Sequence, residues 1–297
     1  LAVEATALGR LASRFYLRLG TAERFARLAR RDEITTTDVL RAVAAAETFD
    51  SVSARSDESD AVAAVVGDGH DDLEPGQRKV LAILQAGMDG STPAALKSDA
   101  WVIRQNAGRL LAACRAFLDR FAGPQAANLA SRLAARLETG VSEDAVGVTA
   151  IDGVGASRAR TLAAADLSSP AAVVEAGVEG LVAAGLSESV AERVHERARD
   201  LPAIAVDWGD LPANVAPDER ILQEVTVRSR AGDARASIRV TVNGHEMTAK
   251  DAYLGEATVP VALYGGGEAD ALDLELVVTF PELPLRPVRV ERTVRVR

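Results

Sequence analysis

The chain has 297 residues, of which 48% are hydrophobic and 26% are charged, so it is long enough for about two folded domains and is not a disordered chain. Acidic residues outnumber basic ones by 43 to 34, giving a net charge of −9. This excludes a generally basic nucleic-acid-binding protein and limits any nucleic-acid contact to a local surface. The single cysteine, Cys114, excludes an internal disulfide and a cysteine-built metal site, and we expect a cytoplasmic setting.

The N-terminal part of the chain is predicted to be an all-helical bundle, because its apolar residues recur at spacings of three and four. The first helix is expected to bury the face made by Leu8, Leu11, Phe15 and Leu19. Thr21 is expected to cap the second. Four further helices are predicted: one that starts near Thr37, a short one around 62–66, one that ends at Gly87, and one over 125–137. The first two helices carry seven arginines against one glutamate. These arginines form either a phosphate-facing patch or a basic face that pairs, within the bundle, with the acidic stretch that follows up to Glu74. We favour the second interpretation.

The longest predicted helix runs from an N-cap at Ser98 to about Phe121, where Gly123-Pro124 stops it. Its core face is expected to contain Ile103, Leu110, Cys114, Phe117 and Leu118. On another side, Trp101, Arg104, Gln105 and Arg109 fall at helical spacing. An aromatic residue and arginines on one face suit the binding of single-stranded nucleic acid. The alternative is that Trp101 is a core anchor and that the arginines are solvated. Judged from the sequence of this helix without further context, the alternative is the better interpretation.

The segment Ile151–Ala159 fits the helix-hairpin-helix pattern h-x-G-h-G-x-x-x-A. Two glycines allow a tight turn whose backbone N–H groups, at a helix N-terminus, can bind a phosphate. Gly185–Ala191 repeats the spacing as a degenerate second hairpin, which we expect to be mainly structural. The alternative is that both hairpins only pack helices. The candidate nucleic-acid-binding residues here are Gly153, Val154, Gly155, Arg158 and Arg160.

From about Val206 the apolar residues alternate with period two, which predicts some six or seven short strands. The clearest segments are 225–227, 238–242, 259–263, 274–278 and 288–290. Asn243-Gly244 and Gly265-Gly266-Gly267 supply turns. We therefore predict a multidomain chain, α then β, with a helical bundle (1–142), a tandem helix-hairpin-helix domain (143–202) and a β-sandwich (203–297). The sandwich would resemble immunoglobulin or fibronectin type III domains.

Enzyme signatures are missing from the sequence, so we expect no catalytic residues and no metal site. There is no G-x-x-x-x-G-K-[ST] motif, and the three histidines are scattered along the chain. The loop Asp68–Asp72 can in principle bind a metal, but an exposed acidic loop is the better interpretation. No stretch approaches 18 uninterrupted apolar residues, so no membrane span or membrane partner is predicted.

Several stretches, in their order along the chain, resemble one known module. Leu8–Tyr16 is similar to an opening L-G-R-x-x-S-x-x-Y motif. Phe49, Arg55 and Glu58 match an F-x5-R-x-x-E segment, although Thr48 stands where Glu is usual. The stretch from Ser98 to Ala113 resembles the long helix that follows, and Asp251–Gly255 is similar to a D-x-Y-L-G motif. The module is the C-terminal "Sec sixty-three" or Brl module of Ski-two-like superfamily 2 helicases, and the arginine-rich, acidic composition suggests a haloarchaeal source.

The resemblance implies a non-catalytic accessory module of an ATP-dependent RNA or DNA helicase. In such helicases two RecA-like motor domains, which use ATP and Mg²⁺, and a winged helix precede this module. Its long ratchet helix, here 98–121, lies against the single strand that leaves the motor, the hairpin guides the strand further, and the sandwich contacts other proteins. The alternative is a protein–protein interaction scaffold without nucleic-acid binding, as in the translocation relative of the same family. We expect no cofactor in this chain itself, since ATP and Mg²⁺ would belong to the motor domains.

Overall fold

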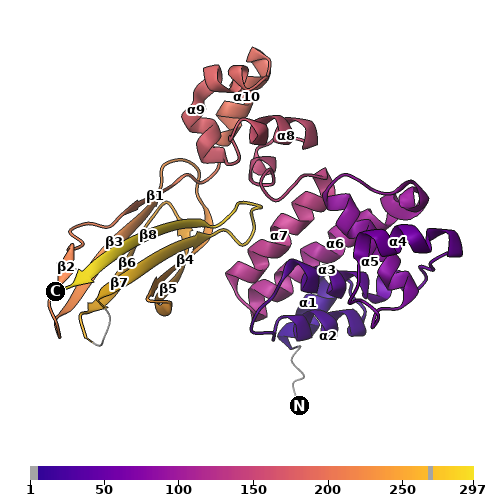
Figure 1. Ribbon diagram of the computed structural model, residues 1–297, viewed down its shortest axis with the longest axis horizontal. Coiled ribbons are helices and arrows are strands. Elements are labelled where there is room, and N and C mark those ends of the chain that lie inside the picture. Colours follow the sequence, from indigo (N-terminus) through magenta and orange to yellow (C-terminus); the bar gives the residue numbers. More distant parts are fainter. Residues whose placement is uncertain (1–5, 267–269) are drawn as a thin grey trace. The chain divides into compact units, whose positions relative to one another are not determined.

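The structure, a computed structural model, describes residues 6–266 and 270–297. The chain is mixed, with helices first and strands after them (Figure 1). The helices are α1 (Ala7–Arg14), α2 (Leu19–Leu28), α3 (Thr36–Ala44), α4 (Ser59–Val66), α5 (Pro75–Met88), α6 (Lys97–Phe121), α7 (Pro124–Thr139), α8 (Ala156–Ala164), α9 (Pro170–Ala183) and α10 (Glu188–Ala198). The strands are β1 (Ile204–Asp207), β2 (Asn214–Val215), β3 (Arg220–Ser229), β4 (Ala234–Val242), β5 (His245–Leu254), β6 (Glu256–Tyr264), β7 (Ala271–Thr279) and β8 (Val288–Val296).

Contacts within the chain define two compact units. The helical unit comprises Leu1–Thr149, Gly155–Ala163 and Pro281–Pro284. The C-terminal unit comprises Ala150–Val154, Ala164–Phe280 and Leu285–Arg297. The three predicted domains, with boundaries after residues 142 and 202, stay a prediction.

The core of the helical unit is built around α6, the longest of its helices. The predicted inward face of α6 is confirmed, since its five side chains are buried: Ile103, Leu110, Cys114, Phe117 and Leu118. The ring of Phe117 meets that of Phe25 from α2 edge-on, with centroids 5.8 Å apart and planes at 72°, the arrangement that aromatic pairs prefer. Small alanines from neighbouring helices fill the rest, including Ala22, Ala44, Ala82 and Ala130.

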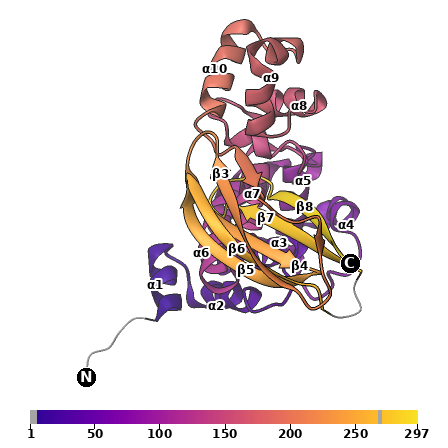
Figure 2. The ribbon, with the colours of Figure 1, turned by 90° about the vertical axis from the view of Figure 1, so that its left-hand side faces the viewer.

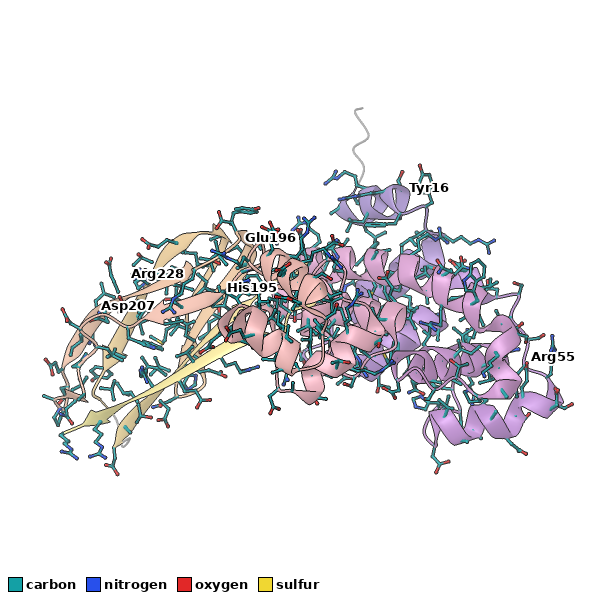
Figure 3. The ribbon with its side chains drawn as sticks, turned by 90° about the horizontal axis from the view of Figure 1, so that it is seen from above. Tyr16, Arg55, His195, Glu196, Asp207 and Arg228 are labelled. Carbon is teal, nitrogen blue, oxygen red and sulfur yellow. The ribbon has the colours of Figure 1, made fainter. Side chains whose placement is uncertain are left out.

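The first helix is shorter than predicted, and the break that ends it comes from Tyr16. Tyr16 has a left-handed φ of 51°, and the N–H of Leu17 bonds to the carbonyl of Ala12, 2.9 Å away. This is a Schellman ending, in which glycine is the usual residue. Leu19 therefore belongs to α2 and is 65% exposed, so its predicted place on the buried face of the first helix is wrong. Figure 3 labels Tyr16, which is 88% exposed.

Thr21 does not cap α2, because the helix already starts at Leu19. Its N–H and its hydroxyl instead bond to the carboxylate of Glu47, with the N–H 2.8 Å from Oε2. The threonine thereby ties α2 to the turn that follows α3. By contrast, α3 begins close to its predicted start, with Thr35 and Asp38 forming a reciprocal capping box.

The strands form two sheets, with orders β1-β3-β6 and β2-β8-β7-β4-β5 (Figures 1 and 2). Side chains alternate between buried and exposed along β6 and along the first half of β7, so each sheet has one apolar face, as in two sheets packed face to face. All pairings are antiparallel except the two-residue pairing of β2 with β8.

The Asn243-Gly244 turn is confirmed: both residues have positive φ, 49° and 77°, as a two-residue hairpin between β4 and β5 requires. The strand after it, β5, escaped the sequence analysis because it lies at a sheet edge and most of its side chains are exposed, so no alternation marks it. Of the predicted glycine turn, Gly267 lies outside the described residues.

The short segment Pro281–Pro284 belongs to the helical unit although strands flank it in the sequence. Ser131 of α7 donates a hydrogen bond to the carbonyl of Pro281 at 2.7 Å. Asn128, one turn earlier, donates to the carbonyl of Leu283 at 3.1 Å. These contacts explain why two polar residues of α7 are buried, since buried amides and hydroxyls need hydrogen-bond partners.

Candidate nucleic-acid interface

The exposed side of α6 carries the residues singled out by the sequence. Trp101 is 72% exposed, so the alternative that it is a core anchor is wrong. Gln105 and Arg109 follow at spacings of four and are exposed as well. Because α6 buries its opposite side completely, this aromatic and polar face is held on a rigid support.

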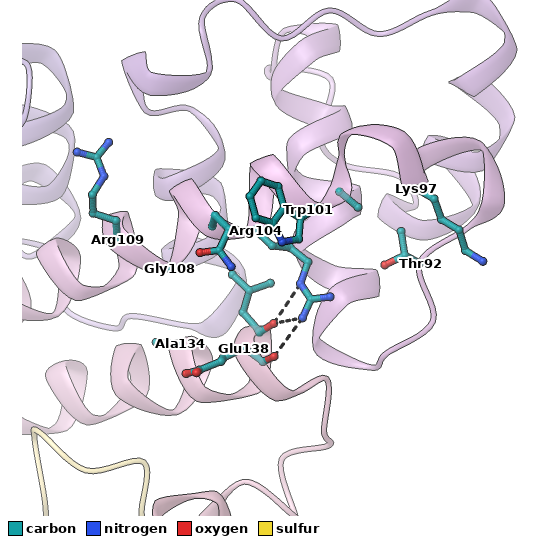
Figure 4. Close-up of a pocket in the computed structure, with 11 residues that line it drawn as sticks. Thr92, Lys97, Trp101, Arg104, Gly108, Arg109, Ala134 and Glu138 are labelled. Atoms are coloured by element: carbon teal, nitrogen blue, oxygen red, sulfur yellow. Dashed lines mark hydrogen bonds between the residues drawn. The ribbon is translucent and has the colours of Figure 1, made fainter. Parts of the chain in front are cut away.

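A groove of about 900 Å³ lies along this face, between α6 and α7 (Figure 4). It brings together all four predicted residues of the long helix: Trp101, Arg104, Gln105 and Arg109. Sequence reasoning missed the other wall. Ala134, Leu137 and Glu138 of α7 line it, together with Lys97 at the start of α6, and no sequence signal shows which face of α7 meets α6. The groove therefore combines an indole ring, cationic groups and an apolar floor.

Arg104 has a structural task inside the groove. Its Nε donates to the carbonyl of Leu137 at 3.2 Å and its Nη2 bonds to the carbonyls of Leu137 and Glu138, the latter at 3.3 Å (Figure 4). These carbonyls belong to the last turn of α7, where helical partners are missing. Arg104 thus closes the end of α7 and joins it to α6. Over residues 6–266 and 270–297, by contrast, Arg109 has no carboxylate or carbonyl partner.

We expect Arg104→Gln to lower the free energy of unfolding of the helical unit by about 1.5–3 kcal/mol, because the charged hydrogen bonds to the carbonyls of Leu137 and Glu138 are lost. Arg109→Gln, on the same helix, is expected to change it by less than about 0.5 kcal/mol. Urea unfolding followed by circular dichroism at 222 nm measures both. Equal effects of the two substitutions would contradict the assignment of a structural role to Arg104 alone.

A buried ion cluster fixes the start of α6. Lys79 of α5 lies 2.7 Å from Oε1 of Glu58 and 2.5 Å from Oδ2 of Asp99, and also donates to the carbonyl of Ser53 at 3.3 Å. Asp99 is therefore an ion-pair partner inside the helix. The predicted cap at Ser98 is wrong, since α6 begins at Lys97 after a 3-10 turn.

The charge states of this cluster follow from its contacts. Burial by itself lowers the pKa of Lys79, but the bonds and charges of Asp99 and Glu58 outweigh it and raise the pKa. Burial likewise raises the pKa of Glu58, yet hydrogen bonds from the Arg55 backbone and from Lys79 bring it below its ordinary value. All three groups are thus charged at neutral pH, and the paired charges compensate one another.

The hairpin residues lie in a separate turn. Gly153 has a φ of +84° and Gly155 is exposed, and a Cβ on either would meet no atom within 4 Å. Val154 is buried and its N–H bonds to the carbonyl of Ile151 at 3.0 Å. The turn is therefore tight, with its glycines open to solvent and its valine inside.

The two arginines after this turn differ in their surroundings. Arg158 is exposed. Arg160 bonds through Nη2 to the carbonyl of Gly140, which has a φ of +65° and ends α7. Arg160 thus ties α8 to the end of α7, a contact that no sequence motif indicates.

Other kinds of site find little support. Over residues 6–266 and 270–297, no three His, Cys, Asp or Glu side chains are grouped so that they could hold a metal ion. Burial raises the pKa of the Cys114 thiol to about 12, so the thiol is not a nucleophile at neutral pH. None of the described helices combines the length and the apolar character needed to cross a membrane.

Comparisons with solved structures give only weak likenesses. The CARDB domain of the PF1109 protein from Pyrococcus furiosus is 20% identical over 33% of this chain and 94% of that domain, with a TM-score of 0.29. The alkylpurine DNA glycosylase AlkC of Pseudomonas fluorescens is 10% identical over 98% and 96% of the two chains, with a TM-score of 0.22. These scores are too low to support an argument. A comparison with curated proteins gives no match.

The family comparison is decisive, because one model spans nearly the whole chain. The Sec63 Brl domain model matches residues 5–283, which include α1 to α10 and most of the strands. The chain belongs to the Sec63 Brl domain family, a non-catalytic accessory domain associated with helicases.

Proposed function

We propose that this chain is the accessory module of an ATP-dependent helicase and that its α6–α7 groove holds the unwound single strand of RNA or DNA. The observation that supports this most is the exposure of Trp101 beside Gln105 and Arg109 in one groove. An exposed indole offers a face on which a base stacks, and a guanidinium attracts the phosphate backbone. Neither contact depends on the identity of the base, so the groove can hold a strand of any sequence as it moves past.

The module acts without chemistry of its own. Bases stack on Trp101 while Arg109 and Lys97 contact phosphates, so the strand is held between the power strokes of the motor. Two contacts anchor α6: the Lys79 cluster at its start and the buried Phe117 near its end. They keep the helix in place while the motor pulls on the strand. RecA-like motor domains and a winged helix upstream supply ATP hydrolysis and unwinding.

The remaining parts have accessory roles in this proposal. The exposed turn at Gly153 and Gly155 contacts a phosphate, as helix-hairpin-helix turns do, and guides the strand. The two sheets form an immunoglobulin- or fibronectin III-like sandwich that contacts proteins. Its exposed apolar residues Leu222, Tyr253 and Met247 are suited to that contact.

The test is fluorescence anisotropy of labelled single-stranded RNA and DNA, titrated with the chain at several salt concentrations. Trp101→Ala is expected to weaken binding by about 5- to 150-fold, the equivalent of the 1–3 kcal/mol of one stacked base. Arg109→Gln is expected to lower the slope of log K against log salt by about 0.7, the value of one single-strand phosphate.

The matched control is Tyr253→Ala with Arg292→Gln, which removes an exposed aromatic ring and an exposed cation from the C-terminal unit. Binding that is unaffected in this control and weakened in the groove variants supports the proposal. Binding of equal strength in all variants, or no binding at the lowest salt that keeps the chain folded, favours the protein-interaction scaffold instead.

A further inference from the structure

A second concave surface in the helical unit is lined by arginines. It is a pocket of about 340 Å³ between α2, α3 and the loop before α5. Arg24, Arg27 and Arg31 come from α2 and the turn after it, and Arg41 comes from α3. The apolar part of the wall consists of Leu28, Ala42, Ala45 and Leu73. The pocket shares no lining residue with the α6–α7 groove.

Two of the four guanidinium groups are neutralised by carboxylates. Arg31 lies 3.0 Å from Oδ1 of Asp38, and Arg41 pairs with Asp72 and lies 2.7 Å from Nδ1 of His70. Burial raises the pKa of Asp38, but hydrogen bonds from Thr35 and the charges of both arginines outweigh it and lower the pKa. Asp38 is therefore ionised at neutral pH, and it and Asp72 hold their arginines in place as fixed walls of the pocket.

The other two arginines have no such partner. Among the residues that the structure describes, no carboxylate lies within ion-pair distance of Arg24 or Arg27. Moreover, the Nε of Arg24 is buried and has no hydrogen-bond acceptor. A buried donor without an acceptor is unfavourable, and four arginines against two aspartates leave an excess charge of +2 in the lining. The lining thus favours an anion with several acceptor atoms.

A phosphate group fits this requirement better than a carboxylate. Its oxygens point in several directions and can accept from guanidinium groups on two helices, whereas a carboxylate presents two oxygens in one plane. The surface around the pocket is also basic, since α1, α2 and the adjoining turns carry seven arginines against three acidic residues, Glu23, Asp32 and Glu33. In a chain with a net charge of −9, such a local patch is the electrostatic footprint of a polyanion.

We propose that this arginine pocket, lined by Arg24, Arg27, Arg31 and Arg41, binds a backbone phosphate of a nucleic-acid strand, as a contact additional to the α6–α7 groove. The identity of the strand rests on the proposed function, whereas the recognition of phosphate rests on the pocket alone. The competing ligand is an acidic segment of a protein. The experiments below distinguish this ligand from a nucleic-acid phosphate.

The first experiment uses inorganic phosphate and does not depend on nucleic acid. The Nε–H resonance of Arg24, assigned by its loss in Arg24→Gln, is followed by ¹⁵N–¹H NMR during titration with phosphate against chloride at constant ionic strength. A saturable shift of this resonance, absent for Arg30, which lies outside the pocket, supports the proposal. An equal response of both arginines, or none, overturns it.

The second experiment identifies the ligand by measuring the salt dependence of oligonucleotide binding. Arg24→Gln with Arg27→Gln is compared with Arg14→Gln with Arg30→Gln, which removes the same charge from α1 and the turn after α2, outside the pocket. We expect only the pocket variant to lower the slope of log K against log salt by about 0.7 for the phosphate lost. Arg27→Gln alone, at an exposed position, repeats the test without risk to folding.

The outcomes also separate this inference from the proposed function. If the pocket variant changes the slope while Trp101→Ala has no effect on binding, the arginine pocket stands and the groove proposal fails. If both double variants bind alike, the pocket proposal is overturned whatever Trp101→Ala does. Displacement of phosphate by poly-glutamate but not by an oligonucleotide overturns it in favour of an acidic protein partner.

Discussion

Lys79→Met is expected to destabilise the helical unit by about 3–5 kcal/mol, the cost of removing one partner from a buried ion pair. The Glu58 side chain is 1% exposed. Without the ammonium group its carboxylate stays buried, and no other cation lies as close to it among the described residues. Asp99 loses the contact that fixes the first turn of α6. Methionine replaces the length of the side chain, so the loss reflects charge rather than a cavity.

The measurement is urea unfolding followed at 222 nm, with Lys250→Met as the control. Lys250 is an exposed lysine of β5 whose replacement is expected to change stability by less than about 0.5 kcal/mol. A loss below about 1 kcal/mol for Lys79→Met would contradict the account, because a solvated pair gives no more than that.

The same cluster predicts how stability depends on pH. The pKa values of Glu58 and Asp99 are lowered in the folded chain, so their contribution is present above the unfolded carboxyl pKa of about 4 and is lost as pH falls through the folded values. The pKa of Lys79 is raised above 10.5, so its contribution is present below that pH and is lost as pH rises through the folded value. Lys79→Met is expected to flatten both limbs.

The second large effect is expected for Phe117→Ala, with a loss of about 3–5 kcal/mol. Phe117 is fully buried and contacts the rings of Phe25 and Phe121, at centroid distances of 5.8 and 6.1 Å. Its removal leaves a cavity between α2 and α6 that the surrounding alanines cannot fill. The loss is measured by the same unfolding experiment.

Val102→Ala is the control for this substitution, because Val102 lies on α6 and is exposed, and its truncation is expected to cost less than about 0.5 kcal/mol. Phe117→Leu is expected to lie between the two, since leucine leaves a smaller cavity. Equal losses for Phe117→Ala and Val102→Ala would show that α6 is not anchored through Phe117.

Periodicity alone predicted much of the helical unit. Spacings of three and four located α6 and its buried face, including Cys114 and Phe117, because a helix that crosses a core must bury one side. The change to period two located most strands of the two sheets. The same spacing placed Trp101 and Arg109 on one face, and both residues line the α6–α7 groove.

What the sequence could not show depends on contacts between distant residues. Tyr16 ends α1 in a conformation that usually belongs to glycine, so no residue signal marks the break. Arg104 bonds to carbonyls 33 and 34 residues away, and Lys79 reaches Glu58 across 21 residues. Backbone carbonyls carry no sequence signature, and a lone lysine in an amphipathic helix looks like a solvated one.

The central claim, that bases of a single strand stack on Trp101, is tested most directly by the fluorescence of this residue. The chain has two tryptophans, and Trp208 is buried with an Nε1 that has no hydrogen-bond partner, so Trp208→Phe removes the second emitter without removing a hydrogen bond. Single-stranded RNA or DNA is titrated into this variant and into Trp101→Phe, which keeps only Trp208. The account predicts saturable quenching of Trp101 and none of Trp208. Binding by anisotropy without quenching of Trp101 would contradict it.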